Sequence, residues 1–178
     1  ADFTRASGTF AVNPYWTELT SDMPTARAGL AVVAGADGLI YAIGGTPGAI
    51  NIGNLSSSAG PTNAVQIYNP QTGVWSNGPA LPTALWGAGA TLGPDGRIYV
   101  MGGLSSTSGA AERRVYAFNT SRQVWEGVAD LAFGQDNFSL LGITAASSNG
   151  KVYAFDGMDR FGSAVNTTQI YDTIAGTW

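Results

Sequence analysis

Asp-Gly-Arg-Ile-Tyr-Val-Met-Gly-Gly, residues 95–103, combines a turn, a short apolar strand and a glycine doublet. Asp95-Gly96 favours a two-residue hairpin, because such turns need residues that accept positive φ. Residues 98–101 have the length and composition of a buried strand. Gly102-Gly103 allows the backbone to turn where a Cβ atom would clash. Together these features predict a hairpin strand that ends in a sharp turn.

The same pattern occurs twice more. Residues 37–45 read Asp-Gly-Leu-Ile-Tyr-Ala-Ile-Gly-Gly, and residues 149–157 read Asn-Gly-Lys-Val-Tyr-Ala-Phe-Asp-Gly, with Asp156-Gly157 replacing the doublet. In each copy an aromatic residue also precedes a tryptophan by seven positions. These pairs are Tyr68 and Trp75, Phe118 and Trp125, and Tyr171 and Trp178. Three copies in phase indicate a repeat protein.

Each repeat of about fifty residues contains several short strand-like segments. The expected strands are 27–34, 39–43, 64–68 and one from Val74 in the first repeat; 98–101, 114–118 and one from Val124 in the second; and 138–146, one around Tyr153, and 168–171 in the third. We divide the chain into residues 1–23, with a spare outer strand near Trp16, and three blades at 24–80, 81–130 and 131–178. The third blade lacks its outer strand in this prediction. Four antiparallel strands per unit predict an all-β propeller.

The chain resembles the kelch-repeat β-propeller family from Trp16 to Trp178. The residues that carry the resemblance are the doublets Gly44-Gly45 and Gly102-Gly103, the tyrosines Tyr41 and Tyr99, and the tryptophans Trp75, Trp125 and Trp178. Tyr153 and Gly157 hold the corresponding places in the third copy. The resemblance implies kelch-type blades, about three of them, forming half or part of a six- or seven-bladed propeller. The tyrosines at 41, 99 and 153 recur because the blade repeats, which favours core packing for them over a cofactor site.

The connections between strands differ in length according to the end of the blade at which they lie. Strand direction alternates, so the first-to-second and third-to-fourth hairpins share one end, and these are short. The long connections 46–63, 104–113, 128–137 and 158–167 share the other end. Variable loops on a rigid scaffold commonly carry binding residues. The alternative is that these polar loops are only spacers.

Five residues are candidates for ligand binding. Arg27 begins an inner strand near a central channel and could hold a carboxylate with both arms of its guanidinium, although an ion pair between blades is favoured. Trp86 could stack on a sugar or peptide, although packing between blades is favoured. Asp159, Arg160 and Phe161 could form a contact patch on one loop, and a local surface ion pair is the alternative there.

Four sequons indicate candidate N-glycosylation sites, at Asn54, Asn119, Asn137 and Asn166. All lie in predicted loops or at strand ends, where a glycan could be accommodated. They favour a secreted or cell-surface glycoprotein, and a cytoplasmic location stays open.

Composition excludes several classes of function. The net charge is −4 with eight Lys and Arg residues, and no basic stripe exists, which argues against nucleic acid as a partner. Histidine and cysteine are absent, so disulfides, thiolate nucleophiles and the usual zinc or copper sites are excluded, and we expect no cofactor and no metal. No apolar run has the length of a membrane-spanning helix.

Three hypotheses for function remain. The first is a non-catalytic structural or protein-interaction scaffold, extracellular, which acts through its long loops. The second is a carbohydrate-binding propeller that uses loop aromatics. The third and weakest is a hydrolase built on loop carboxylates such as Asp156 and Asp159, for which no catalytic partner can be identified.

Three blades are too few to close a propeller, since closed propellers have about four to eight. We therefore expect other protein to cover the two end faces. Either a second copy completes a six-bladed ring, or other segments of a longer chain supply the missing blades.

Overall fold

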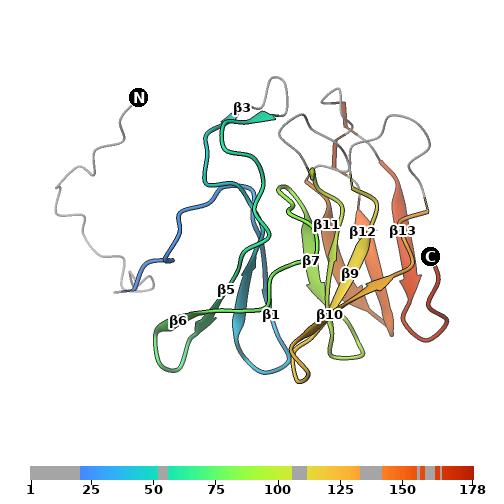
Figure 1. Ribbon diagram of the computed structural model, residues 1–178. Helices are drawn as coiled ribbons and strands as arrows, with labels where there is room; N and C mark the ends of the chain where they lie inside the picture. The colour runs from blue at the N-terminus through green and yellow to red at the C-terminus, as the bar shows by residue number, and fades with distance from the viewer. Residues whose placement is uncertain are drawn as a thin grey trace, which may run out of the picture.

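The computed structural model describes residues 21–51, 56–105, 112–132, 142–155, 157–158, 163–164 and 166–178. In these residues the strands form three larger antiparallel sheets and one small hairpin (Figure 1). The three sheets stand side by side in chain order. The prediction of an all-β fold built from antiparallel propeller blades is confirmed.

The first two sheets each contain four strands, and we call the sheets blades 1, 2 and 3 in chain order. Blade 1 has the order β1 (Ala31–Ala34), β2 (Ile40–Ile43), β5 (Val65–Asn69), β6 (Val74–Asn77). Blade 2 contains β7 (Gly89–Leu92), β8 (Ile98–Met101), β9 (Val115–Asn119) and β10 (Val124–Val128). Blade 3 contains β11 (Thr144–Ser148), β12 (Lys151–Phe155) and β13 (Thr168–Asp172).

Blade 3 shows three strands in the part of the chain that the structure describes. After β13 a tight turn brings Thr177 back to form a single β-bridge with Asp172. The spare strand predicted near Trp16 lies outside the described residues. The predicted domain boundaries stay a prediction.

The inner strands differ most from the sequence-based prediction. The strand predicted over 27–34 begins at Ala31, because Gly29 before it has a φ of +62° and interrupts the extended backbone. The strand predicted over 138–146 is found at Thr144–Ser148. The long connection 46–63 contains an unpredicted hairpin, formed by β3 (Ile50–Asn51) and β4 (Ser56–Ser57).

The predicted two-residue hairpin is wrong for the first two repeats. In blade 1 the turn spans residues 35–39, and the Gly38 and Gly35 amides donate to the carbonyls of Gly35 and Leu39. Only Gly38 in this turn has a positive φ, +78°, which is the pattern of a type I turn followed by a glycine bulge. Blade 3 does have the two-residue hairpin, since both Asn149 (+49°) and Gly150 (+78°) have positive φ.

The glycine doublets adopt the predicted conformation. Gly44 and Gly45 have φ of +66° and +88°, and Gly102 and Gly103 have +67° and +89°. A Cβ atom added to Gly44 would lie 2.4 Å from the carbonyl oxygen of Leu85 in the next blade. Gly44 therefore lets the next blade approach closely, whereas a Cβ atom at Gly45 or Gly103 would meet the backbone of the same repeat, at the Ala28 and Trp86 carbonyls.

The hydrophobic cores lie between the blades rather than inside one sheet. The first core joins Tyr41, Ile43, Val65 and Ile67 of blade 1 to Ile98, Val100, Tyr116 and Phe118 of blade 2. The second joins Tyr99, Met101, Val115 and Ala117 of blade 2 to Val152, Ala154 and Tyr171 of blade 3. Alternate residues of β8 and β9 thus belong to different cores, as expected for a sheet that is buried on both faces.

Each outer tryptophan attaches its blade to the chain segment that precedes the blade. The indole N–H groups of Trp75, Trp125 and Trp178 donate to the carbonyls of Ser21, Pro79 and Ala129, at 3.2, 2.9 and 2.8 Å. Each ring also packs on the aromatic residue seven positions earlier. The recurring aromatic pair is therefore part of the packing of each blade.

Candidate binding surface at the long-loop end

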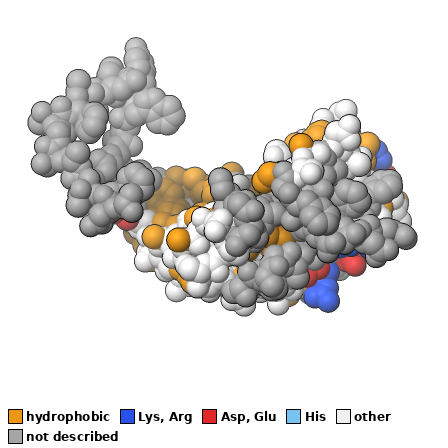
Figure 2. Space-filling model, turned by 90° about the horizontal axis from the view of Figure 1, so that it is seen from above, with side chains coloured by type: hydrophobic (Ala, Val, Ile, Leu, Met, Phe, Trp, Pro, Cys, Tyr) orange, Lys and Arg blue, Asp and Glu red, His pale blue; other side chains and the backbone are white. Residues whose placement is uncertain are grey.

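The described parts of the long connections lie at one end of the stack, and the short hairpins lie at the other (Figure 1). Figure 2 looks onto the long-loop end, where most described side chains are apolar or uncharged and the charged ones lie toward the rim. A partner would therefore meet a surface with few charges in its described part.

The β3–β4 hairpin is the best-described element of this end. The hydroxyl groups of Thr46 and Ser57 share a short, buried hydrogen bond, and the Ala49 amide donates to the Ser58 hydroxyl at 3.0 Å. Thr46 is in turn fixed by paired backbone bonds to Ala28. These bonds attach the β3–β4 hairpin to the long-loop end of blade 1.

Trp86 is not on the surface. Its side chain is 3% exposed and packs with Leu104 and Ile50, the latter from the β3–β4 hairpin. Its indole nitrogen has no hydrogen-bond partner among the described residues. The arrangement matches the packing alternative considered from the sequence, and in this conformation the ring is not available for stacking on a sugar.

Arg27 is also buried, at 9% exposure, and its guanidinium points into blade 1. It donates to the carbonyls of Gly44 (2.5 Å), Ala64 (2.9 Å) and Ala42 (3.3 Å), and to the side-chain oxygen of Gln66 (3.0 Å). None of the ion pairs between described residues involves Arg27. The favoured sequence interpretation, an ion pair between blades, is therefore replaced by bonds to backbone of its own blade. Burial lowers the pKa of this guanidinium.

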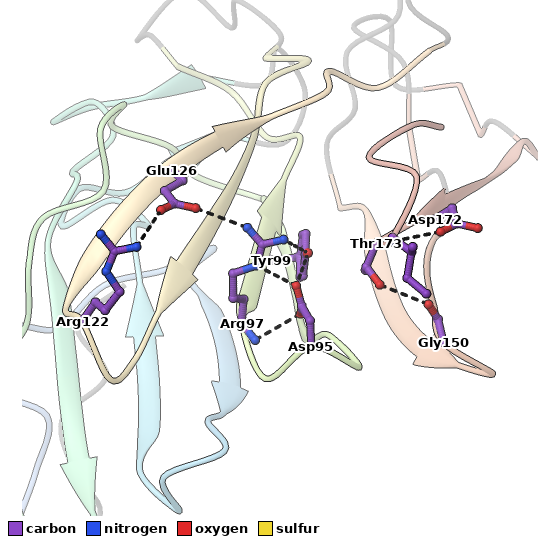
Figure 3. Close-up of polar contacts among 9 residues, drawn as sticks. Asp95, Arg97, Tyr99, Arg122, Glu126, Gly150, Asp172 and Thr173 are labelled. Atoms are coloured by element: carbon purple, nitrogen blue, oxygen red, sulfur yellow. Dashed lines mark hydrogen bonds and ion pairs between the residues drawn. The ribbon is translucent and has the colours of Figure 1, made fainter.

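Figure 3 shows a polar network at the short-hairpin end of blade 2. Arg97 contacts Asp95 (2.6 Å) and Glu126 (3.3 Å), and it donates to the Tyr99 hydroxyl at 2.8 Å. Tyr99 donates to Asp95 at 2.8 Å. Burial would raise the pKa of Asp95, but the bonds from Arg97 and Tyr99 hold it below its ordinary value. Burial and the adjacent Asp95 raise the pKa of Tyr99.

The pairing of this aspartate with the tyrosine is not predicted from the sequence. In blade 1, Tyr41 donates to Asp37 at 2.6 Å, as Tyr99 does to Asp95. The signal was present as an aspartate four positions before each tyrosine. A structural role for the aspartate, as acceptor for the buried tyrosine, explains its recurrence.

One of the two described sequons coincides with a structural motif. The side-chain oxygen of Asn119 accepts hydrogen bonds from the amides of Ser121 and Arg122, and Asn69 and Asp172 close the equivalent turns in the same way. An asparagine at 119 is thus explained by the turn itself. Asn166 is exposed. Asn54 and Asn137 lie outside the described residues, and glycosylation stays a prediction.

The remaining ligand-binding candidates, Asp159, Arg160 and Phe161, lie outside the described residues, as does Asp156. Within the described ranges, no group of three acidic, histidine or cysteine side chains is placed to hold a metal ion. In the same ranges, no helix is long and apolar enough to cross a membrane.

Antiparallel sheets of three and four strands, packed face to face with a core at each boundary, are the architecture of β-propeller blades. Residues 27–82 and 90–132 match the family model of the Kelch motif, which is more than half of the chain. The chain therefore belongs to the kelch family. It is 30% identical over 112 residues to Kelch-like protein 33 of Homo sapiens, a match that covers 60% of this chain and 19% of that protein. The chain thus spans less than a fifth of the length of this relative.

Proposed function

We propose that this chain is a non-catalytic scaffold that binds protein partners through its long-loop end. The observation that carries the proposal is the separation of the two ends: the short hairpins repeat one design, whereas the long connections differ in length and sequence. Membership of the kelch family supports it, because kelch propellers commonly mediate protein interactions. Variable loops on a rigid support are a common arrangement for recognition.

We further propose that protein covers the two end faces of the three-blade stack. Either a second copy of the chain or other segments of a longer chain could supply the neighbouring blades. The observations behind this proposal are that the cores form between blades and that Val32 of blade 1 and Phe155 and Ile170 of blade 3 are 59%, 42% and 46% exposed.

The interaction proposal can be tested by photo-crosslinking at two matched alanines. Ala59 is exposed on the long-loop end, and Ala175 is exposed in the turn after β13 at the other end. A photoreactive amino acid at position 59 should form adducts with one protein species in extract from the source cells, and the same group at position 175 should not. Equal adducts from both positions, or none from position 59, would contradict the proposal.

A further inference from the structure

Among the tryptophans in the described residues, Trp86 alone leaves its indole N–H without a hydrogen-bond partner. Trp75, Trp125 and Trp178 each donate to a backbone carbonyl, at 3.2, 2.9 and 2.8 Å. Trp86 is 3% exposed, so its N–H is shielded from water as well. A buried donor without an acceptor costs folding free energy, and its presence calls for an explanation.

The backbone at position 86 does not require an aromatic side chain. Trp86 and Leu104 form an isolated antiparallel β-bridge in blade 2, and Ala28 and Thr46 form the same bridge in blade 1. In both bridges each residue donates its amide to the carbonyl of the other. Alanine thus fills this position in one blade and tryptophan in the next, so the reason for the indole lies in its side chain.

The Trp86 ring lies at the boundary of blades 1 and 2, where Ile50 of β3 packs against it. Leu104 of blade 2 is buried in the same apolar cluster. A Cβ atom built on Gly29 of blade 1 would lie 3.3 Å from Cε3 of Trp86 and 3.6 Å from Cδ1 of Ile50. Ile50 is itself only half-buried. Part of the cover of the ring therefore comes from a hairpin that lies outside the three blade sheets.

The hairpin that carries Ile50 is a small element at the long-loop end (Figure 1). In its described part, β3 and β4 pair over only two residues each. The hydroxyl hydrogen bond between Thr46 and Ser57 joins it to the start of the long connection. A two-stranded hairpin is marginally stable by itself, and elements with few buried contacts open at a low cost in free energy. Ile50 can therefore move away from Trp86 while the blade sheets stay folded.

We propose that Trp86 is a binding residue concealed by the β3–β4 hairpin, and that its ligand is a neutral peptide segment with an apolar side chain beside an amide carbonyl. The inference rests on the proposed protein scaffold and gives the chemistry of its partner at one subsite. The carbonyl accepts the indole N–H, and the apolar side chain takes the place of Ile50 against Leu104 and the ring. A neutral acceptor fits because both residues packed on the ring are apolar. A carboxylate would lose its hydration there without gaining a cation.

The direct test follows the indole N–H resonance of Trp86 in the full chain by NMR, with N-acetyl-leucine-N-methylamide as the probe. The resonance is identified among those of the five tryptophans by its loss in Trp86→Phe. The probe should cause a saturable downfield shift of the indole proton, because the N–H gains an acceptor. N-acetyl-glycine-N-methylamide, which has the carbonyls but no apolar side chain, should bind about tenfold more weakly or worse.

A disulfide tests whether the hairpin controls access to the ring. Thr46→Cys with Ser57→Cys places two thiols where the hydroxyls now bond, and the wild-type chain contains no cysteine. The oxidised variant should hold Ile50 on the ring and lower the affinity for the leucine probe by about tenfold or more, and reduction should restore it. Ile50→Ala should instead raise the affinity. Val74→Ala, at a β6 side chain that is 59% exposed, is the matched control and should leave it unchanged.

Equal affinity in the oxidised and reduced forms, or no saturable shift of the Trp86 resonance in any form, would overturn the inference. A shift caused by methyl β-glucoside and not by the leucine probe would also overturn it, because the ring would then bind carbohydrate. A saturable shift with the leucine probe, together with no adducts from position 59 in cell extract, would support the subsite and contradict the scaffold proposal. The two proposals can therefore fail separately.

Discussion

At position 103 the backbone leaves no room for a side chain. Gly103 has a φ of +89°, and an added Cβ would lie 2.8 Å from the Trp86 carbonyl oxygen and 3.0 Å from the Ala88 amide nitrogen. Gly103→Ala should lower the free energy of unfolding by about 3 kcal/mol, from left-handed strain plus the clash with backbone. Gly96→Ala, with a φ of +78° and no atom within 4 Å, should cost about 1 kcal/mol. Equal costs in urea denaturation would show that crowding at Gly103 is unimportant.

The Arg27 guanidinium donates hydrogen bonds to three carbonyls of blade 1 and to the Gln66 side chain. Arg27→Ala should lower the free energy of unfolding by about 3 kcal/mol, because it leaves buried acceptors unpaired. Arg27→Lys should recover only part of this loss, since an ammonium group cannot reproduce the planar fork. Arg122→Ala, at a side chain 70% exposed, should change stability by less than about 0.5 kcal/mol. Denaturation in which Arg27→Ala matches Arg122→Ala would contradict this role.

For single residues, local conformation could be predicted from the sequence, but long-range contacts could not. The conformation of the glycine doublets was predictable, because a doublet after an apolar strand indicates a sharp backbone turn. The burial of Arg27 was not, since its acceptors lie 15 to 39 positions away, and three of them are carbonyls in β2, in the doublet and just before β5. For Trp86 the sequence favours packing between blades, but it does not identify the residue that covers the ring, because Ile50 belongs to the β3–β4 hairpin, which residues 46–63 do not predict.

Among the elements, the turn after β13 in blade 3 offers a pH-dependent test. The ion pair with Lys151 (2.7 Å), together with the Ala175 and Ile174 amides, lowers the pKa of Asp172 to about 2. Because the folded-state pKa is depressed, the stabilisation is present above the ordinary pKa of about 3.9 and is lost as the pH falls through about 2. An NMR titration should place the Asp172 midpoint near that lower value. A midpoint near its ordinary value would contradict the ion pair.

Asp172→Asn should keep the turn, because Asn69 and Asn119 close the equivalent turns with the same side-chain oxygen. The variant loses the charge that faces Lys151, so its melting temperature should fall less than that of the wild type between about pH 4 and pH 2. Asp172→Ala should lose the turn bonds as well and melt lower at every pH. Identical acid dependence of wild type and Asp172→Asn would be the contrary result.

Of the three turns that follow the inner strands, the dipeptide predicts the type correctly only in blade 3. Asp-Gly and Asn-Gly both favour a two-residue hairpin, yet the structure has it only at Asn149-Gly150. In blades 1 and 2 the aspartate bonds a tyrosine instead. Gly35 lies close to the Tyr41 ring, where a Cβ atom would be 2.7 Å from a ring carbon. The turn over residues 35–39 allows the Asp37–Tyr41 hydrogen bond. This bond depends on the strand register across the sheet and not on the Asp-Gly dipeptide.

The whole molecule is a stack of blades with one core at each boundary. Leu81 and Leu131 are equivalent residues of the segments that join consecutive blades, and both are buried. Their amides donate to the carbonyls of Asn63 and Arg113, respectively, in the preceding blade. The blade count and strand order could be predicted from the repeat, since a period of about fifty residues indicates blades. How each core divides between neighbouring blades required the register of each pair.

This division predicts how the stack comes apart. Leu81→Ala and Leu131→Ala should each destabilise by about 3 kcal/mol, because each leaves a cavity at a blade boundary. In a stack with nearest-neighbour contacts, a weakened boundary releases the blade that has only that contact. Hydrogen exchange should therefore rise in β1, β2, β5 and β6 for Leu81→Ala, and in β11, β12 and β13 for Leu131→Ala. Uniform exchange over all three blades in both variants would instead indicate that the chain unfolds as one cooperative unit.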